Sequence, residues 1–146
     1  MADSTNGFPI LRQDLTNGTG SSQAGQLFAK SYTILTTANQ DLDLAGVLTN
    51  GFGETITFAA LKTVVVAIDT PDGSKEVRFG PQGVTNPMQL WFSATTAGFY
   101  DRIFDFFVQT NEWTGWAVTG GSADTIRINN PTGSSVTVHV VLIGTI

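Results

Sequence analysis

Hydrophobic and polar residues alternate with a period of two in the last third of the chain. Between residues 124 and 129, Ile126 and Ile128 fall on one side and polar residues on the other. Residues 135–143 alternate in the same way and become wholly apolar at the end. This period predicts two antiparallel strands with one buried and one solvated face each. The turn at 130–133 predicts that they pair as a hairpin, and the apolar end predicts that the second strand is central in its sheet.

Short β patterns separated by turn clusters also fill the middle of the chain. The predicted strands lie at residues 27–36, 41–44, 54–68, 76–79, 88–93, 102–109 and 116–118. A helix is the alternative over 54–62. With the two C-terminal strands the count is eight or nine, which predicts an all-β protein, a β-sandwich or jelly roll of about eight strands.

The first 25 residues lack a regular pattern and contain several Asn-Gly and Gly-Ser turns. They predict a flexible or docking N-terminal arm at 1–25, followed by a β-sandwich domain at 26–146. The arm carries one apolar patch, at Phe8, Ile10 and Leu11. Two alternatives stay open: a terminus without contacts, or an anchor that orders when these side chains dock on a neighbouring subunit.

The predicted strand at 102–109 has apolar residues on both of its faces. The residues assigned to the core are Phe104, Phe106 and Val108. Ile103 and Phe107 then face the other way, beside Asp105. Apolar residues on an outward face indicate a second packed layer or a protein interface, so Ile103 and Phe107 are the candidate contact surface.

Several aromatic residues fall in or near predicted loops, namely Trp91, Phe99, Tyr100, Trp113 and Trp116. Trp91 and Trp116 suit the capping of the sandwich ends. Exposed aromatics also form protein hot spots or stack on sugars. Tyr100 and Trp113 are therefore candidates for a protein interface, with sugar binding as the alternative.

Charged residues make up 13% of the chain, about half of the usual ~25%. A weakly charged surface of this kind suits either a protein packed against other proteins or a stable extracellular-type domain. The net charge is 7 − 12 = −5, and there is no basic cluster. This balance argues against nucleic-acid binding, which depends on neutralising phosphates. The N-terminus has no signal-peptide pattern, and no apolar run reaches the ~18 residues of a membrane span. We therefore expect synthesis in the cytoplasm and no membrane contact.

No residue pattern indicates catalysis, so we expect a non-enzymatic protein without cofactor or metal. Cysteine is absent, and the lone histidine, His139, lies on a strand as a sheet-face or interface residue. Asp41 and Asp43 are expected on a solvated face, with a calcium site as the alternative. Asp124 opens a strand and is expected to bond backbone N–H groups of a turn.

The C-terminal stretch carries a resemblance to a known group. Residues 115–130 read Gly-Trp-x-Val-x-x-Gly-x-Ala-Asp-x-Ile-x-Ile-x-Asn, and a valine-rich strand ending in Ile143-Gly144 follows. This pattern resembles small virion proteins of tailed bacteriophages, and a weaker likeness extends back to residue 41.

The resemblance implies a structural protein with a jelly-roll-like fold that decorates, or cements, the capsid exterior after synthesis in the host cytoplasm. The implied partners are the major capsid protein and further copies of the chain, as a homo-oligomer, with a trimer expected. Two alternatives stay open: a tail-, neck- or fibre-associated virion module, and a carbohydrate-binding receptor module using Trp113 and Tyr100.

Overall fold

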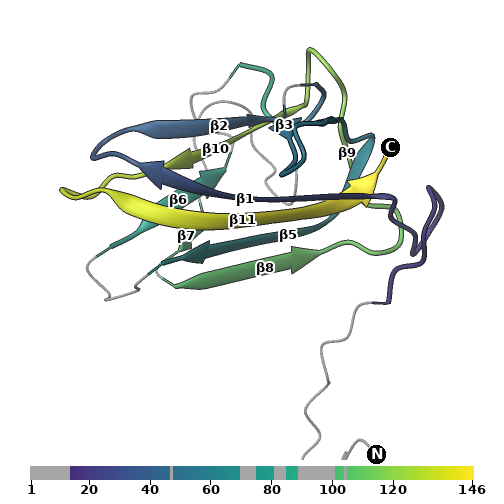
Figure 1. The fold of residues 1–146 in the computed structure, drawn as a ribbon, viewed down its shortest axis with the longest axis horizontal. Coiled ribbons are helices and arrows are strands. Elements are labelled where there is room, and N and C mark those ends of the chain that lie inside the picture. Colours follow the sequence, from purple (N-terminus) through teal and green to yellow (C-terminus); the bar gives the residue numbers. More distant parts are fainter. Residues whose placement is uncertain (1–13, 47, 70–74, 81–84, 89–100, 104) are drawn as a thin grey trace, which may run out of the picture.

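The computed structural model describes residues 14–46, 48–69, 75–80, 85–88, 101–103 and 105–146 (Figure 1). Within these ranges the regular structure is entirely strand, which confirms the all-β prediction. The longer strands are β1 (Gln26–Ile34), β2 (Asn39–Asp43), β5 (Ala60–Ile68), β6 (Val77–Gly80), β7 (Asp101–Ile103), β8 (Phe106–Thr110), β10 (Thr125–Asn129) and β11 (Val136–Thr145). The two-residue strands are β3 (Leu48–Thr49), β4 (Thr55–Ile56) and β9 (Trp116–Ala117). The helix considered for 54–62 is replaced by β4 and the start of β5.

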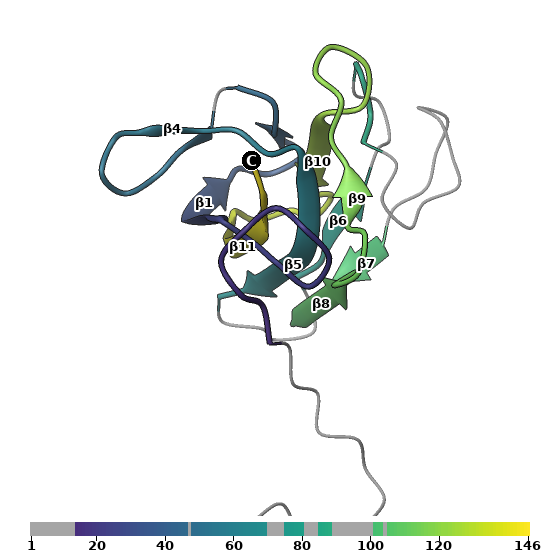
Figure 2. The same cartoon turned by 90° about the vertical axis from the view of Figure 1, so that its right-hand side faces the viewer.

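The eight longer strands form two antiparallel sheets that pack face to face (Figures 1 and 2). The first, called the β11 sheet, has the order β1-β11-β5-β8, with β9 beside one end of β5. The second, called the β10 sheet, has the order β2-β10-β6-β7. The pairings are nested, as in one long hairpin that has been rolled up: β1 with β11, β2 with β10, β5 with β8 and β6 with β7. This is the jelly-roll arrangement, and the predicted central place of the last strand is confirmed.

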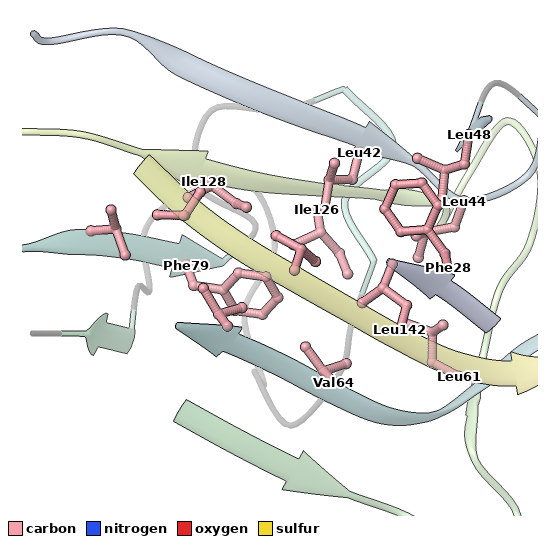
Figure 3. Close-up of a cluster of buried hydrophobic side chains, with 14 of the residues drawn as sticks. Phe28, Leu42, Leu44, Leu48, Leu61, Val64, Phe79, Ile126, Ile128 and Leu142 are labelled. Carbon is pink, nitrogen blue, oxygen red and sulfur yellow. The ribbon is translucent and has the colours of Figure 1, made fainter. Parts of the chain in front are cut away.

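The hydrophobic core lies between the two sheets (Figure 3). The β11 sheet contributes Phe28, Val64 and Leu142, and the β10 sheet contributes side chains such as Leu42, Ile126, Ile128 and Phe79; all are fully or almost fully buried. The period-two pattern at 124–129 therefore assigned the buried face correctly. Each such side chain gains roughly 1.5–3 kcal/mol from its removal from water.

The predicted hairpin between residues 124–129 and 135–143 is wrong. β10 pairs with β2 and β6, whereas β11 pairs with β1 and β5. The turn between them carries the chain from one sheet to the other. The side-chain amide of Asn130, which is fully buried, donates hydrogen bonds to the backbone oxygens of Ile34 at 3.0 Å and Ser134 at 2.8 Å. These bonds satisfy carbonyls that have left their ladders, so they allow the crossing inside the protein.

The predicted single strand at 102–109 is also wrong, and so are the orientations assigned to Ile103, Phe106, Phe107 and Val108. Phe104 lies outside the described residues. β7 ends at Ile103 in the β10 sheet, and β8 begins at Phe106 in the β11 sheet. Ile103 is buried, and the Phe107 ring packs 6.1 Å from that of Phe79, whereas Phe106 is 60% exposed. The chain changes sheets here, and apolar residues on both parities concealed which parity faces the core. Ile103 and Phe107 therefore do not form the contact surface predicted for them.

Residues 14–25 close one end of the sandwich (Figure 2). The Gly25 N–H donates to the Gly144 oxygen at 2.9 Å, and the Ser22 N–H donates to the Glu112 oxygen at 3.0 Å. Gly144 itself lies against β5, where a Cβ atom would overlap the Ala60 carbonyl oxygen. Only glycine fits this position, which coincides with an irregularity in the β11–β5 register between Ile143 and Gly144.

Candidate interaction surface

The outer side of the β10 sheet is charged and polar, and we call it the polar face. Its outward residues are Asn39, Asp41 and Asp43 of β2, Arg78 of β6, Arg102 of β7, and Thr125, Arg127 and Asn129 of β10. Arg127 and Asp41 form a two-pronged ion pair, with Nε–Oδ1 at 2.7 Å and Nη2–Oδ2 at 2.8 Å. The Asp43 carboxylate accepts a hydrogen bond from the Ala45 N–H at 3.0 Å. Both predicted surface carboxylates thus have protein partners, and no group of three metal-ligating residues occurs in the part of the chain that the structure describes.

The outer side of the β11 sheet is different, and we call it the apolar face. By strand parity it consists of fourteen residues, all but Thr63 at least partly exposed: Leu27, Ala29, Ser31 and Thr33 of β1, Thr63, Val65 and Ala67 of β5, Phe106, Val108 and Thr110 of β8, and Thr137, His139, Val141 and Ile143 of β11. The strand register places Ala29, Val141, Val65 and Val108 side by side in one row across the four strands.

Eight of the fourteen side chains on this face are hydrocarbon, and its polar members are Ser31, Thr33, Thr63, Thr110, Thr137 and His139. No member is an Asp, Glu, Lys or Arg. Leu27 is 59% exposed and Phe106 is 60% exposed. An antiparallel sandwich usually presents polar residues at such positions. The apolar face therefore has the character of a contact surface rather than of a solvated one.

Four polar members of the apolar face bond to each other in two pairs. Ser31 Oγ and His139 Nδ1 lie 2.7 Å apart, and the hydroxyls of Thr33 and Thr137 lie 3.3 Å apart. Their hydrogen-bonding capacity is therefore partly met within the face, which lowers the cost of removing it from water. His139 is exposed, as predicted for a sheet-face residue.

A hollow of about 370 Å³ lies at one end of the apolar face, lined by Leu15, Ala24, Gly25, Gln26, Leu27 and Ile143. A second hollow, also of about 370 Å³, lies over β1 and β11 around Ser31 and His139. Both hollows include members of the apolar face, so the face is not a uniform plane.

Strand β1, which is one of the two edges of the β11 sheet, carries a charge. Lys30 is exposed, and its Nζ lies 5.4 Å from the centroid of the Tyr32 ring, a cation–π distance. A lysine on an edge strand disfavours the addition of a further strand from another molecule. The apolar face, rather than this edge, is the part of the sheet suited to contact.

Tyr32 lies on the same strand and is partly buried. Burial raises the pKa of its phenol.

Trp113 stands apart from both faces, on the loop that follows β8. It is 70% exposed, whereas Trp116 packs partly buried against the core. Lys62, which is 2% exposed, fixes the backbone of this loop. Its Nζ donates hydrogen bonds to the backbone oxygens of Glu112 at 3.1 Å and Trp113 at 2.8 Å. The exposed indole therefore sits on a fixed backbone.

The residues predicted for a site do not come together in one place. Trp113 is exposed, and Ile103 and Phe107 belong to the interior. Phe8, Ile10, Leu11, Tyr100 and Trp91 lie outside the described residues. Asp124 accepts a hydrogen bond from the Gly121 N–H, as predicted for a turn residue. Sequence reasoning missed the apolar face, although the apolar outward residues Val65, Val108 and Val141 were its signal.

No protein-family model matches the chain, and no curated protein matches it. One solved structure that it is similar to is described as "Cyanophage Pam1 capsid asymmetric unit". The two chains are 17% identical, the match covers 99% of each, and the TM-score is 0.40. A TM-score below 0.5 does not establish a shared fold.

In the described residues there is no helix with the length and hydropathy needed to cross a membrane.

Proposed function

We propose that this chain is a structural protein of a tailed-phage virion that decorates the outside of the capsid and stabilises it by bridging major capsid subunits. The apolar face is the observation that carries the proposal, because it gives the sandwich a surface for contact with another protein subunit, either of the capsid or a further copy of this chain. The resemblance of residues 115–130 to phage virion proteins supplies the class. The proposed role is non-enzymatic and requires no cofactor.

The residues that carry the resemblance, within 115–130, pack in the core or bond the backbone, so this pattern indicates a fold rather than a chemistry. Trp116 packs on the core, Ile126 and Ile128 are buried in it, and Asn130 ties the crossing between the sheets. The pattern therefore supports a jelly roll of the virion type, and it assigns no chemistry to these residues.

The mechanism of such a protein is binding linkage. A ligand that contacts two neighbouring subunits of an assembled shell binds the intact lattice better than separated subunits, so it shifts the equilibrium toward the lattice. A net charge of −5 favours a position on the capsid exterior, away from packaged nucleic acid. The proposed partners are the major capsid protein and further copies of this chain.

The test is cryo-microscopy of purified particles with and without the protein, together with their resistance to heat. We expect density at repeated positions on the outside of the head, and particles without the protein should lose integrity at a lower temperature. Density at the tail or neck, with heads of unchanged resistance, would contradict the decoration role and favour the other virion positions.

A second candidate is favoured by one observation, the exposure of Trp113 on a fixed loop. An indole held in this way can stack on the C–H groups of a sugar ring. The test is a glycan array with the wild-type protein and Trp113→Ala. Retention of glycans by the wild type and loss in the variant would support a receptor-binding module, and an array without bound glycans would remove it.

A further inference from the structure

We propose that the apolar face is covered by the same face of a second copy of this chain, related to the first by a two-fold axis. The inference deepens the proposed function and rests on it in one respect, the homo-oligomer. It names the surface that forms this oligomer and the symmetry that the surface imposes.

The size of the apolar face fits such a contact. Four strands about 4.8 Å apart, each contributing about seven residues at about 3.3 Å, give roughly 450 Å² in plan. Exposed apolar patches of about 300–600 Å² on a single protein are often functional. Two copies together would cover roughly 900 Å² in plan, and somewhat more accessible surface because side chains are not flat. The covered area is thus close to the roughly 1,000 Å² that a specific interface should exceed. We therefore expect an association that depends on protein concentration.

Charge distinguishes a second copy from other partners. Two copies of an acidic chain, each with net charge −5, repel one another. A contact between them is therefore opposed least at a surface without carboxylates, and the apolar face is such a surface. Contacts between identical subunits are richer in apolar residues and poorer in charge than transient contacts. The polar face, which carries Asp41, Asp43 and three arginines, is instead suited to a partner recognised by charge.

The geometry of a sheet face favours two-fold symmetry. If the face bound a different part of the next copy, an open row of copies would end with one apolar face in water, and only a closed ring would cover every face. Contact between like faces covers both at once, with the two sheets stacked about 10 Å apart. The charged edge at Lys30 disfavours the alternative in which β1 pairs with a strand of another copy. Contact between like faces needs only two copies, so the expected unit is a dimer, whereas the sequence resemblance implies a trimer.

The experiment is sedimentation of the full chain over a concentration series, for the wild type and four variants. Val141→Glu and Val141→Lys place a charge in the middle of the face, and Phe106→Ser removes an exposed ring from its border. Asn39→Glu is the matched control, because it adds the same charge as Val141→Glu at an exposed position on the polar face. Far-UV circular dichroism and urea unfolding show whether each variant is folded.

The wild type and Asn39→Glu should form dimers with similar dissociation constants. Both Val141 variants should raise the dissociation constant at least about 100-fold, because each copy brings the same charge into a desolvated contact. Phe106→Ser should raise it about tenfold, and it remains informative if the Val141 variants fail to fold. A wild-type monomer at every concentration, a trimer, or a dimer that survives the folded variants would overturn the proposal.

The same variants separate this inference from the proposed function. If a monomeric variant still occupies the head of the particle, the decoration role stands without the dimer. If the wild-type protein is a dimer through the apolar face but is absent from the head, the dimer stands and the decoration role fails.

Discussion

The two sheets of this jelly roll share one core, but their outer sides differ in charge and in polarity. The polar face carries five charged residues, including the Arg127–Asp41 pair, whereas the apolar face carries none. The inner sides are alike, since both present buried aliphatic and aromatic residues. The shared core does not require this difference, so we propose that the outer positions reflect what each side of the protein contacts.

The largest expected effect separates inner from outer positions within the same strand. Leu142→Ala removes a fully buried side chain and should lower the free energy of unfolding by about 2–5 kcal/mol. Ile143→Ala, on the apolar face, should cost less than about 1.5 kcal/mol in the monomer, because that side chain is already partly exposed. Urea unfolding of dilute protein measures both. Equal losses would mean that the apolar face is packed as tightly as the core.

The crossing between the two sheets comes next. Asn130→Ala leaves buried carbonyls, among them those of Ile34 and Ser134, without the amide that bonds them. We expect a loss of about 2–3 kcal/mol in urea unfolding. Asn129→Ala is the neighbouring control, because its side chain lies on the polar face, and it should cost less than about 1 kcal/mol. A crossing that tolerates Asn130→Ala would show that the turn is held by other bonds.

The polar face should contribute little to stability despite its good geometry. The Asp41 side chain is 44% exposed and that of Arg127 is 18% exposed, so solvent screens the ion pair. A double-mutant cycle of Asp41→Asn and Arg127→Gln should therefore give a coupling energy of about 0.2–1 kcal/mol. The coupling should shrink at high salt, while association through the apolar face should not weaken. An association that weakens with salt would contradict the uncharged contact.

The smallest effect concerns Tyr32, on the edge strand β1 of the β11 sheet. Burial raises the pKa of its phenol above the ordinary value of 10.0, so the folded state favours the neutral form. The resulting stability is complete below pH about 10 and is lost as the pH rises through the folded-state pKa. Tyr32→Phe should therefore lose less stability than the wild type at alkaline pH. The readout is the urea midpoint between pH 8 and 11, and parallel curves would exclude this contribution.

Much of the fold was predictable because alternation reports burial directly. Ile126 and Ile128 in β10 were placed on one face by parity alone, and both are buried. The pattern does not say which strands pair. β10 and β11 are adjacent in sequence and both alternate, but they belong to different sheets, and the buried amide of Asn130 that marks the crossing looks like any turn asparagine.

The candidate surface was harder to predict than the core. Where both parities are apolar, as at residues 102–109, alternation does not tell which side is buried, and Phe106 and Val108 were wrongly placed inside. The apolar face depends on four strands that are far apart in sequence, and only the register brings Ala29, Val65, Val108 and Val141 into one row. The aromatic residues chosen as candidates were conspicuous by type, whereas the surface is formed by ordinary valines and alanines.

The nested pairing of strands also governs how quickly the protein can reach its native state. β1 pairs with β11 through contacts such as Gln26 with Gly144, which are 144 − 26 = 118 residues apart. Chains whose native contacts join distant segments fold slowly, since the long loops between the partners must close first. During that delay the edges of β1 and β5 that β11 will occupy remain open to other chains. Refolding yield should therefore fall as protein concentration rises, which makes the rate of assembly of this one strand a limit on how much native protein is obtained.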